Sequence, residues 1–291
     1  MAWTMSAVLR TFALFAILTL IFIGIGYLIG FFVGDPTIFM IIFLSIALLI
    51  NIAVYFVSDK LVLSMYRARI VSESEAPKLH SIVEELASDA GIPKPKVAIV
   101  PIDTPNAFAT GRNPKNAVVA VTEGLLRRLN DRELRAVIGH ELGHIKHRDM
   151  LVMTVAATIT SALAIGARMF LWNAMFSRDR EDSSALIIMF LAALGAAIAA
   201  TLVKLAISRQ REYYADEFSA KLTGRPRDLI SALIKISDSV KRRPLTDGNP
   251  ATASLFIVNP FRGGTLINLF STHPPLEKRI ENLKKIEMNL Y

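Results

Sequence analysis

Two long apolar segments stand near the start of the chain, with a short polar segment between them. Phe12 to Val33 and Ile38 to Val57 contain no charged residue. Each segment is long enough, as a helix, to span the roughly 30 Å hydrocarbon core of a bilayer. The intervening Gly34 to Thr37 contains Gly, Asp and Pro, which is typical of a turn. The pattern therefore predicts a transmembrane helical hairpin.

A second pair of apolar segments lies in the second half of the chain. Met150 to Ala167 and Ala185 to Val203 are rich in Ala, and Ser177 to Ser184 separates them with five charged residues. We expect these segments to form a second transmembrane hairpin. Two helices buried in a soluble core would show the same pattern, so this alternative stays open.

The polar stretches have the mixed pattern of an α+β domain. Ser72 to Ala90 has helical spacing, with Ser72 or Ser74 as its cap and Gly91 as its end. Short apolar runs between Pro, Gly and Asn residues predict strands. These strands are expected at Lys96 to Val100, Ala107 to Thr110 and Ala117 to Val121. The chain is thus predicted to be a mainly α membrane protein with two transmembrane hairpins and a small sheet.

One motif carries a defined chemistry. His140 to His144 reads His-Glu-Leu-Gly-His, and Asn130 with Glu133 forms a predicted capping box before it. The motif therefore falls within an amphipathic helix, where residues four apart share a face. Both imidazoles can then bind one metal ion, while Glu141 can take a proton from metal-bound water. We expect one catalytic zinc ion per chain.

A catalytic zinc site usually has a third protein ligand. His147 is excluded, because seven helical residues rise about 10 Å from His140 while zinc bonds are about 2 Å long. The chain has no Cys, which excludes thiolate ligands and disulfides. The third ligand must therefore be a His, Asp or Glu from another segment.

The second apolar hairpin indicates where that ligand lies. His144 stands a few residues before the third apolar segment, and Glu212 stands a few residues after the fourth. Antiparallel helices of similar length, roughly 45 Å each, return the chain to its starting level. Glu212 can then be the third ligand, and Asp216 can accept a hydrogen bond from a ligand imidazole. If the two histidines were not nearby, Glu212 and Asp216 would be interpreted as solvated charges at a helix end.

The net charge of +8 at pH 7 does not indicate a nucleic-acid partner. The basic residues are scattered, without a patch interleaved with aromatic residues or a known binding motif. A lipid bilayer and protein substrates are the expected partners, and the sequence leaves the oligomeric state unknown.

Basic residues in short loops indicate the orientation in the membrane. Gly34 to Thr37 contains none, whereas Lys60, Arg67 and Arg69 follow the second apolar segment. Basic residues also flank the inner ends of the other two segments, at Lys146, Arg148, Arg209 and Arg211. We therefore expect a multi-pass protein with both termini and the motif helix in the cytoplasm.

The chain resembles the HtpX-type membrane zinc metallopeptidases, which are gluzincin relatives of the CAAX prenyl protease. The resemblance rests on His140 to His144, on Arg211 to Asp216, which reads REYYAD, and on the apolar hairpin between them. It also includes Pro105 to Gly111 and Thr272 to Pro275, and it covers nearly the whole chain. The family implies a zinc endopeptidase in bacterial inner or archaeal membranes that cleaves membrane or misfolded proteins on the cytoplasmic side, a role in protein quality control.

The resemblance assigns a role to individual residues. It implies that His140, His144 and Glu212 bind zinc, that Glu141 is the general base, and that Asp216 supports a ligand. It further implies an edge strand that binds an extended substrate backbone, with contacts from Asn106, Ala107, Phe108 and Ala109. Finally, it implies that His273 steadies the tetrahedral intermediate, with Arg279 near it. From the residues alone, His273 precedes two prolines at a helix start, and Arg279 would be a surface charge.

These expectations divide the chain into four regions. Residues 1–60 form the first hairpin and 150–207 the second. Residues 61–149 hold the strands and the motif helix, and 208–291 hold the third ligand and the C-terminal helices. The alternative function is a membrane scaffold or chaperone with a structural zinc, which would have no need of Glu141. A transporter would carry ionisable residues inside its spans, and these are almost absent.

Overall fold

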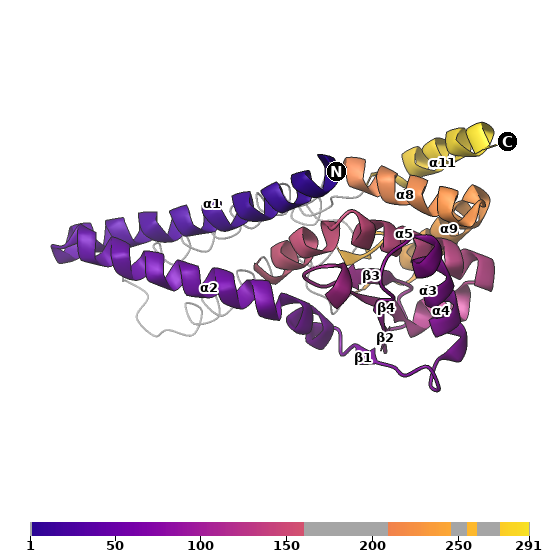
Figure 1. Cartoon of the computed structure of the whole chain (residues 1–291), viewed down its shortest axis with the longest axis horizontal. Helices are drawn as coiled ribbons and strands as arrows, with labels where there is room; N and C mark the ends of the chain where they lie inside the picture. The colour runs from indigo at the N-terminus through magenta and orange to yellow at the C-terminus, as the bar shows by residue number, and fades with distance from the viewer. Residues whose placement is uncertain (1, 160–208, 246–254, 261–273, 291) are drawn as a thin grey trace.

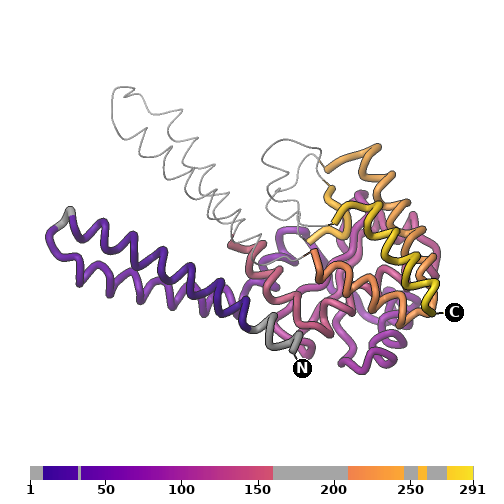
Figure 2. Tube along the Cα trace, turned by 90° about the horizontal axis from the view of Figure 1, so that it is seen from above, coloured from indigo at the N-terminus to yellow at the C-terminus, as the bar shows by residue number. Residues whose placement is uncertain are grey.

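The computed structural model describes residues 2–159, 209–245, 255–260 and 274–290 (Figure 1). Helices α1 (Ala2–Val33) and α2 (Pro36–Met65) lie side by side and extend away from a body that contains the sheet and the other labelled helices (Figures 1 and 2). This mostly helical architecture with a small mixed sheet agrees with the sequence prediction. Most of the second predicted hairpin lies outside the described residues.

The turn between α1 and α2 has the chemistry that the sequence predicted. Asp35 caps α2, and its carboxylate accepts a hydrogen bond of 3.0 Å from the backbone N–H of Ile38. Pro36 occupies the first helical turn, where its missing N–H is not needed. Helix α2 continues to Met65, several residues beyond the predicted end of the hairpin at residue 60.

The hairpin exposes its apolar side chains instead of burying them. Only 17% of the apolar window of α1 and 6% of that of α2 are buried, so neither is the core helix of a soluble domain. Large exposed side chains occur along both helices, including Leu20, Phe31, Ile41, Leu49 and Phe56. An apolar surface of this extent is stable in lipid but not in water.

Polar and small residues join the two helices. The Asn51 side-chain amide donates to Thr19 Oγ1 at 2.9 Å and to the Phe15 carbonyl at 3.3 Å. A hydrogen bond of this kind between helices stabilises their association in a membrane. A side chain at Gly26 would lie 2.7 Å from the Phe39 carbonyl oxygen, so this glycine permits the close approach, whereas Gly24 has no neighbour within 4 Å.

The sheet contains four strands in the order β1-β2-β4-β3. Strand β1 (Arg69–Ile70) pairs antiparallel with β2 (Lys96–Val100), which pairs parallel with β4 (Val118–Thr122). Strand β3 (Ala107–Thr110) pairs antiparallel with β4 and forms one edge of the sheet. The predicted strands are therefore present, with the third shifted by one residue.

The helices around the sheet begin and end at identifiable residues. Helix α3 (Pro77–Asp89) ends before Gly91, as predicted, but begins at Pro77 and not at Ser72. The predicted start is wrong because Ser72 and Glu75 bond to each other in a separate turn, at 2.8 Å from backbone N to carboxylate. Thr122 caps the short α4 (Glu123–Arg128), accepting a hydrogen bond from Leu125 N at 3.1 Å.

Two apolar cores lie on opposite faces of the sheet, as the alternation of side chains along a strand requires. Val97, Val119 and Val121 join one core together with residues of α3, α5 (Asp131–Lys146) and α9 (Pro226–Arg242). Ala98, Val100 and Ala120 join the other, together with the end of α2 and the helix Asp149–Ile159. The second core thus connects the apolar hairpin to the sheet.

The motif helix α5 (Asp131–Lys146) packs against α8 (Arg209–Thr223). The Ser219 hydroxyl donates a buried hydrogen bond of 2.6 Å to the Ala136 carbonyl. A side chain at Gly143 would lie 3.2 Å from Ala215 Cα, a tight contact, so glycine favours this close approach. Helices α9 (Pro226–Arg242) and α11 (Leu276–Leu290) complete the helical layer beside α5 and α8 (Figure 1).

Candidate metal centre

The capping box at the start of α5 fixes the register of the motif. The Asn130 side chain accepts from Glu133 N, and the Glu133 carboxylate accepts from Asn130 N, each at 3.0 Å. The helix then places His140 and His144 one turn apart on its buried face, with exposures of 1% and 4%. The predicted capping box and motif helix are therefore present.

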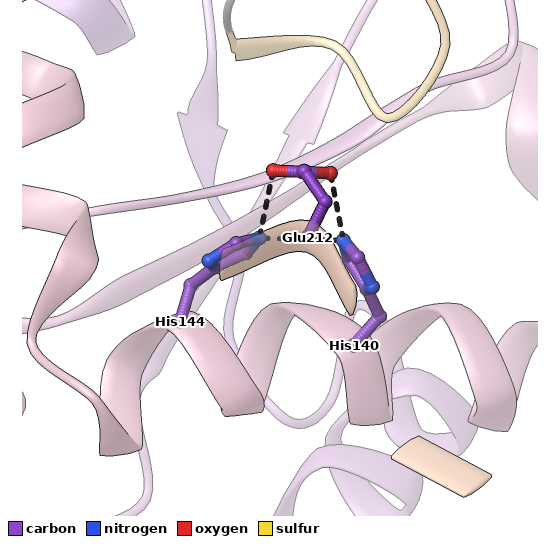
Figure 3. Close-up of side chains that lie close together, drawn as sticks. All are labelled: His140, His144 and Glu212. Carbon is purple, nitrogen blue, oxygen red and sulfur yellow. Dashed lines mark hydrogen bonds and ion pairs between the residues drawn. The ribbon is translucent and has the colours of Figure 1, made fainter. Parts of the chain in front are cut away.

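Glu212, in the first turn of α8, completes a cluster of three metal-binding side chains (Figure 3). The two imidazole Nε2 atoms lie 3.3 Å apart. One Glu212 oxygen lies 3.7 Å from His140 Nε2, and the other lies 3.6 Å from His144 Nε2. The structure thus brings together the three residues that the sequence placed at a metal site.

The donor separations fit a small divalent cation. Zinc bonds of about 2.0–2.2 Å in tetrahedral geometry separate the donor atoms by about 3.3–3.6 Å. The two Nε2 atoms match this spacing, the Glu212 oxygen near His144 lies at its upper limit, and the oxygen near His140 lies slightly beyond it. Two imidazoles and a carboxylate are also a common ligand set of catalytic zinc, with one coordination position left for water.

The buried charge around the cluster also indicates a site for a divalent cation. Four buried carboxylates lie here, those of Glu141, Asp149, Glu212 and Asp216, together with two buried guanidinium groups, those of Arg211 and Arg279. If all are ionised and the histidines are neutral, four negative and two positive charges leave two negative charges. Unpaired buried charge is very unfavourable. One divalent cation would balance the cluster.

Without a cation, protons supply the missing positive charge. Burial raises the pKa of Glu141 to about 8; the carboxylate of Glu212 also raises it, while His144 and a hydrogen bond from the Ala109 backbone lower it. Burial lowers the pKa of His144, but the carboxylates of Asp149, Glu212 and Glu141 outweigh it and raise this pKa to about 9. At neutral pH the metal-free site therefore holds two extra protons.

His140 differs from His144 because of its surroundings. Burial lowers the pKa of His140, and the positive charge of Arg279 contributes in the same direction. Its Nδ1 atom lies 2.9 Å from Asp216 Oδ1, within hydrogen-bonding distance. Asp216 thus lies where the sequence predicted a partner for a ligand imidazole, and this partner leaves Nε2 directed at the cluster.

Arg279 holds Asp216 through a buried bidentate ion pair. Arg279 Nε donates to Asp216 Oδ2 at 2.8 Å, and Nη2 donates to Oδ1 at 2.6 Å. Burial raises the pKa of Asp216, but the adjacent guanidinium outweighs it and holds this pKa below its ordinary value. Arg279 is 2% exposed, so the reading of it as a surface charge is wrong. Its expected place near His273 stays a prediction.

The edge strand β3 borders the cluster from the sheet side. Ala109 and Phe108 line a small cavity together with Glu141, both histidines and Glu212. Its volume is about 10 Å³, close to the minimum that one water molecule needs. Strand β3 is thus next to the metal-binding side chains, where the sequence resemblance placed a substrate-binding strand.

A segment of the chain itself covers this cavity. Leu255, Phe256 and Ile257 also line the cavity, as does Met153. The Asn106 side chain accepts from Ile257 N at 2.9 Å and donates to the Leu255 carbonyl at 3.4 Å. Asn106 was expected to contact substrate, and in this structure its side chain holds the covering segment.

The sequence also made predictions for two other histidines, His147 and His273. His147 ends α5, is not part of the metal-binding cluster, and packs its ring on Phe218 at 5.8 Å between centroids, as its exclusion from the site requires. His273 lies outside the described residues, so its predicted role stays a prediction.

Sequence reasoning missed the pair Asp149 and Arg211. Asp149 Oδ2 lies 3.6 Å from His144 Nδ1, and Arg211 Nη1 lies 2.6 Å from Asp149 Oδ1. Both residues are buried, at 4% and 9% exposure. The available signals were the position of Arg211 next to Glu212 and that of Asp149 shortly after the motif, but Arg211 was counted as a basic loop residue.

The fold and this site together define a membrane metallopeptidase. The model of the family "Peptidase family M48" matches residues 73–287, which include both histidines, Glu141 and Glu212. The chain belongs to peptidase family M48, whose members are metal-dependent proteases. Together with the exposed apolar hairpin, this makes it a membrane protein.

Similar proteins span nearly the same length. The chain is 57% identical over 284 residues to a protein named "Protease HtpX homolog" from Pyrococcus furiosus, covering 97% of this chain and 96% of the relative. It is 51% identical over 279 residues to a protein of the same name from Methanocaldococcus jannaschii, covering 94% and 95%. The predicted relationship to the HtpX-type proteases is confirmed.

The fold also resembles a solved structure, that of Ste24p from S. mikatae. The TM-score is 0.50 at 19% sequence identity. The match covers 97% of this chain and 66% of Ste24p. At this identity the likeness concerns the fold alone.

The two extra protons lead to a testable prediction. At pH 7, binding of one zinc ion should release close to two protons, because a bound cation favours neutral His144 and ionised Glu141. The number released should fall toward zero as the pH rises through 8 and 9, the pKa values of the metal-free groups. Titration calorimetry in buffers of different ionisation enthalpy measures it.

The matched control for this experiment is Glu141→Gln, which cannot carry the second proton and should release about one proton. Metal binding by the unaltered chain without any proton release at pH 7 would contradict the charge balance.

A second prediction concerns the ligand set. Glu212→Gln should weaken zinc binding by more than the roughly 10- to 100-fold typical of losing an outer partner, because it removes both a donor and a negative charge. His147→Ala should bind zinc like the unaltered chain, because His147 lies outside the cluster. Competition with a chelator measures both affinities. The assignment is wrong if His147→Ala loses the metal and Glu212→Gln keeps it.

Proposed function

We propose that this protein is a membrane-embedded zinc endopeptidase that cleaves misfolded or membrane proteins on the cytoplasmic side. The observation that carries the proposal is the closed cluster of His140, His144 and Glu212 with Glu141 buried beside it. Membership of peptidase family M48 and the apolar hairpin support the proposal. The set of buried charges supports one divalent ion per chain.

Zinc bound at this cluster would lower the pKa of a water molecule and polarise the scissile carbonyl. His140 Nε2, His144 Nε2 and one Glu212 oxygen would hold the ion. Asp216, itself held by Arg279, would keep the His140 ring oriented through its Nδ1 atom.

Glu141 is the proposed general base. It is 4% exposed and shares the cavity with both imidazoles, so its carboxylate lies beside the position that water would occupy. A hydrogen bond from the Ala109 backbone directs the carboxylate toward the edge strand. Bound zinc would favour the ionised form of Glu141, which could first accept a proton from water and then donate it to the leaving amine.

Strand β3 is the proposed docking strand for substrate. It forms the edge of the sheet and borders the cavity, so an extended peptide could pair with the backbone of Ala107 to Ala109. The covering segment Leu255 to Ile257 would then have to move aside, and Asn106 would be released to bond with substrate. His273 is proposed to stabilise the oxyanion.

The alternative function is a scaffold with a structural zinc. A structural site needs four protein ligands and no base. Among the described residues the cluster contains three donors, and an additional buried carboxylate, Glu141, stands beside them at a large desolvation penalty. This arrangement favours catalysis over a structural role.

We also propose that both termini and the peptidase domain lie in the cytoplasm. Lys60, Arg67 and Arg69 are exposed at the inner end of α2, whereas the turn Gly34 to Thr37 has no basic residue. Arg211 is buried against Asp149 and does not contribute to this charge bias. The second hairpin is proposed to cross the bilayer as well.

The general-base role is tested with Glu141→Gln. This variant should keep zinc, because Glu141 is not a ligand, but should lose nearly all proteolysis of an unfolded membrane protein. Zinc content and cleavage are measured side by side on purified full-length protein. Equal cleavage by the variant and the unaltered chain, in preparations free of other proteases, would overturn the mechanism.

The orientation is tested by cysteine labelling, which this Cys-free chain permits without background. Thr37 and Ser74 are both exposed and lie on opposite sides of the proposed membrane region. A cysteine at Thr37 should react with an impermeant reagent from outside the cell, whereas a cysteine at Ser74 should react only after permeabilisation. The reverse pattern would show that the orientation is inverted.

A further inference from the structure

Both metal-binding imidazoles have a buried aspartate behind them. Asp216 Oδ1 lies 2.9 Å from His140 Nδ1, and Asp149 Oδ2 lies 3.6 Å from His144 Nδ1. The two aspartates are 0% and 4% exposed. The nitrogen that faces each aspartate is not the one that faces Glu212, so each ring lies between a carboxylate and the metal-binding cluster.

Each aspartate is in turn held by a buried arginine. Arg279 Nη2 lies 2.6 Å from Asp216 Oδ1, and Arg211 Nη1 lies 2.6 Å from Asp149 Oδ1. A buried carboxylate without a partner would lose far more solvation energy than it could recover. The arginines therefore hold both aspartates in place, and the two histidines have matching His–Asp–Arg arrangements.

The second arrangement joins the two elements that carry the ligands. Asp149 follows the end of α5, where Arg148 has a φ of 60° and the chain turns into the next helix. Arg211 belongs to the first turn of α8, directly before Glu212. The Asp149–Arg211 ion pair thus ties the end of α5 to the start of α8 next to His144 and Glu212.

We propose that Asp149, held by Arg211, is a positioning residue that orients His144 for metal binding. This inference rests on the proposed metallopeptidase function. A carboxylate on the Nδ1 side favours the tautomer that carries its proton on Nδ1, which leaves the Nε2 lone pair directed at the metal. The 3.6 Å separation is longer than a hydrogen bond, so Asp149 acts here through its charge, more weakly than Asp216.

The test compares Asp149→Asn with Asp216→Asn in full-length protein, using zinc affinity from chelator competition. Asp149→Asn should lower the affinity roughly 10-fold and Asp216→Asn up to roughly 100-fold, the range found for outer partners of metal ligands. Nitrogen NMR of the five histidines in the zinc-loaded protein should show a changed Nδ1 signal for His144 in Asp149→Asn and for His140 in Asp216→Asn.

Glu133→Gln is the matched control. Glu133 is also a buried carboxylate on α5, 3% exposed and paired with Lys235 at 2.7 Å, but it lies at the far end of the helix. The Glu133→Gln substitution should lower the unfolding temperature of the metal-free protein and leave the zinc affinity and the His144 signal unchanged. A purely structural role for Asp149 would give the same result as this control.

An affinity of Asp149→Asn within twofold of the unaltered chain, with an unchanged His144 signal, would overturn the inference while the proposed function stands. An unaltered chain that binds no zinc would overturn both.

If Asp149→Asn does not fold, Asp149→Glu decides the question, because it keeps the charge of the ion pair and displaces the carboxylate. The His144 signal should then shift with that of His140 unchanged; a His144 signal identical to that of the unaltered chain would overturn the inference.

Discussion

The balance of buried charge between α5 and α8 is the constraint on which the rest of the structure depends. Four carboxylates and two guanidinium groups lie at less than 10% exposure around two imidazoles. No group of this cluster would be stable there alone. The charges therefore require each other, and they require either two protons or one divalent cation, which links metal binding directly to the stability of the peptidase domain.

The fold supplies this cluster from four separate elements. Helix α5 contributes the two ligand histidines and Glu141, and α8 contributes Arg211, Glu212 and Asp216. Arg279 belongs to α11, and Asp149 belongs to the helix that follows α5. Close packing of α5 on α8 at Gly143 and Ser219 sets their spacing. The same helix Asp149–Ile159 contacts α1 through Leu14 and Leu18, so the site is mechanically connected to the membrane hairpin.

The covering segment lies in the region beside strand β3 where a substrate strand is proposed to bind. In this structure Leu255 and Ile257 bond with Asn106, and Leu255 to Ile257 line the cavity beside the metal-binding residues. A substrate strand would approach the same region from the edge of the sheet. Access of substrate and release of this segment are therefore coupled in the proposed mechanism, because both involve Asn106.

The sequence by itself determined the elements whose signals are local. Helical spacing and a capping box located the motif helix, apolar length located the hairpin, and the distance of His147 along the helix excluded it from the site. Glu212 and Asp216 were also found, because antiparallel helices return a chain to its starting level. Tertiary structure alone decided the burial of Arg279, the Asp149–Arg211 pair and the covering segment. These features join residues that are 60 or more positions apart, and their side chains carry no local signal that distinguishes a buried ion pair from a solvated surface charge.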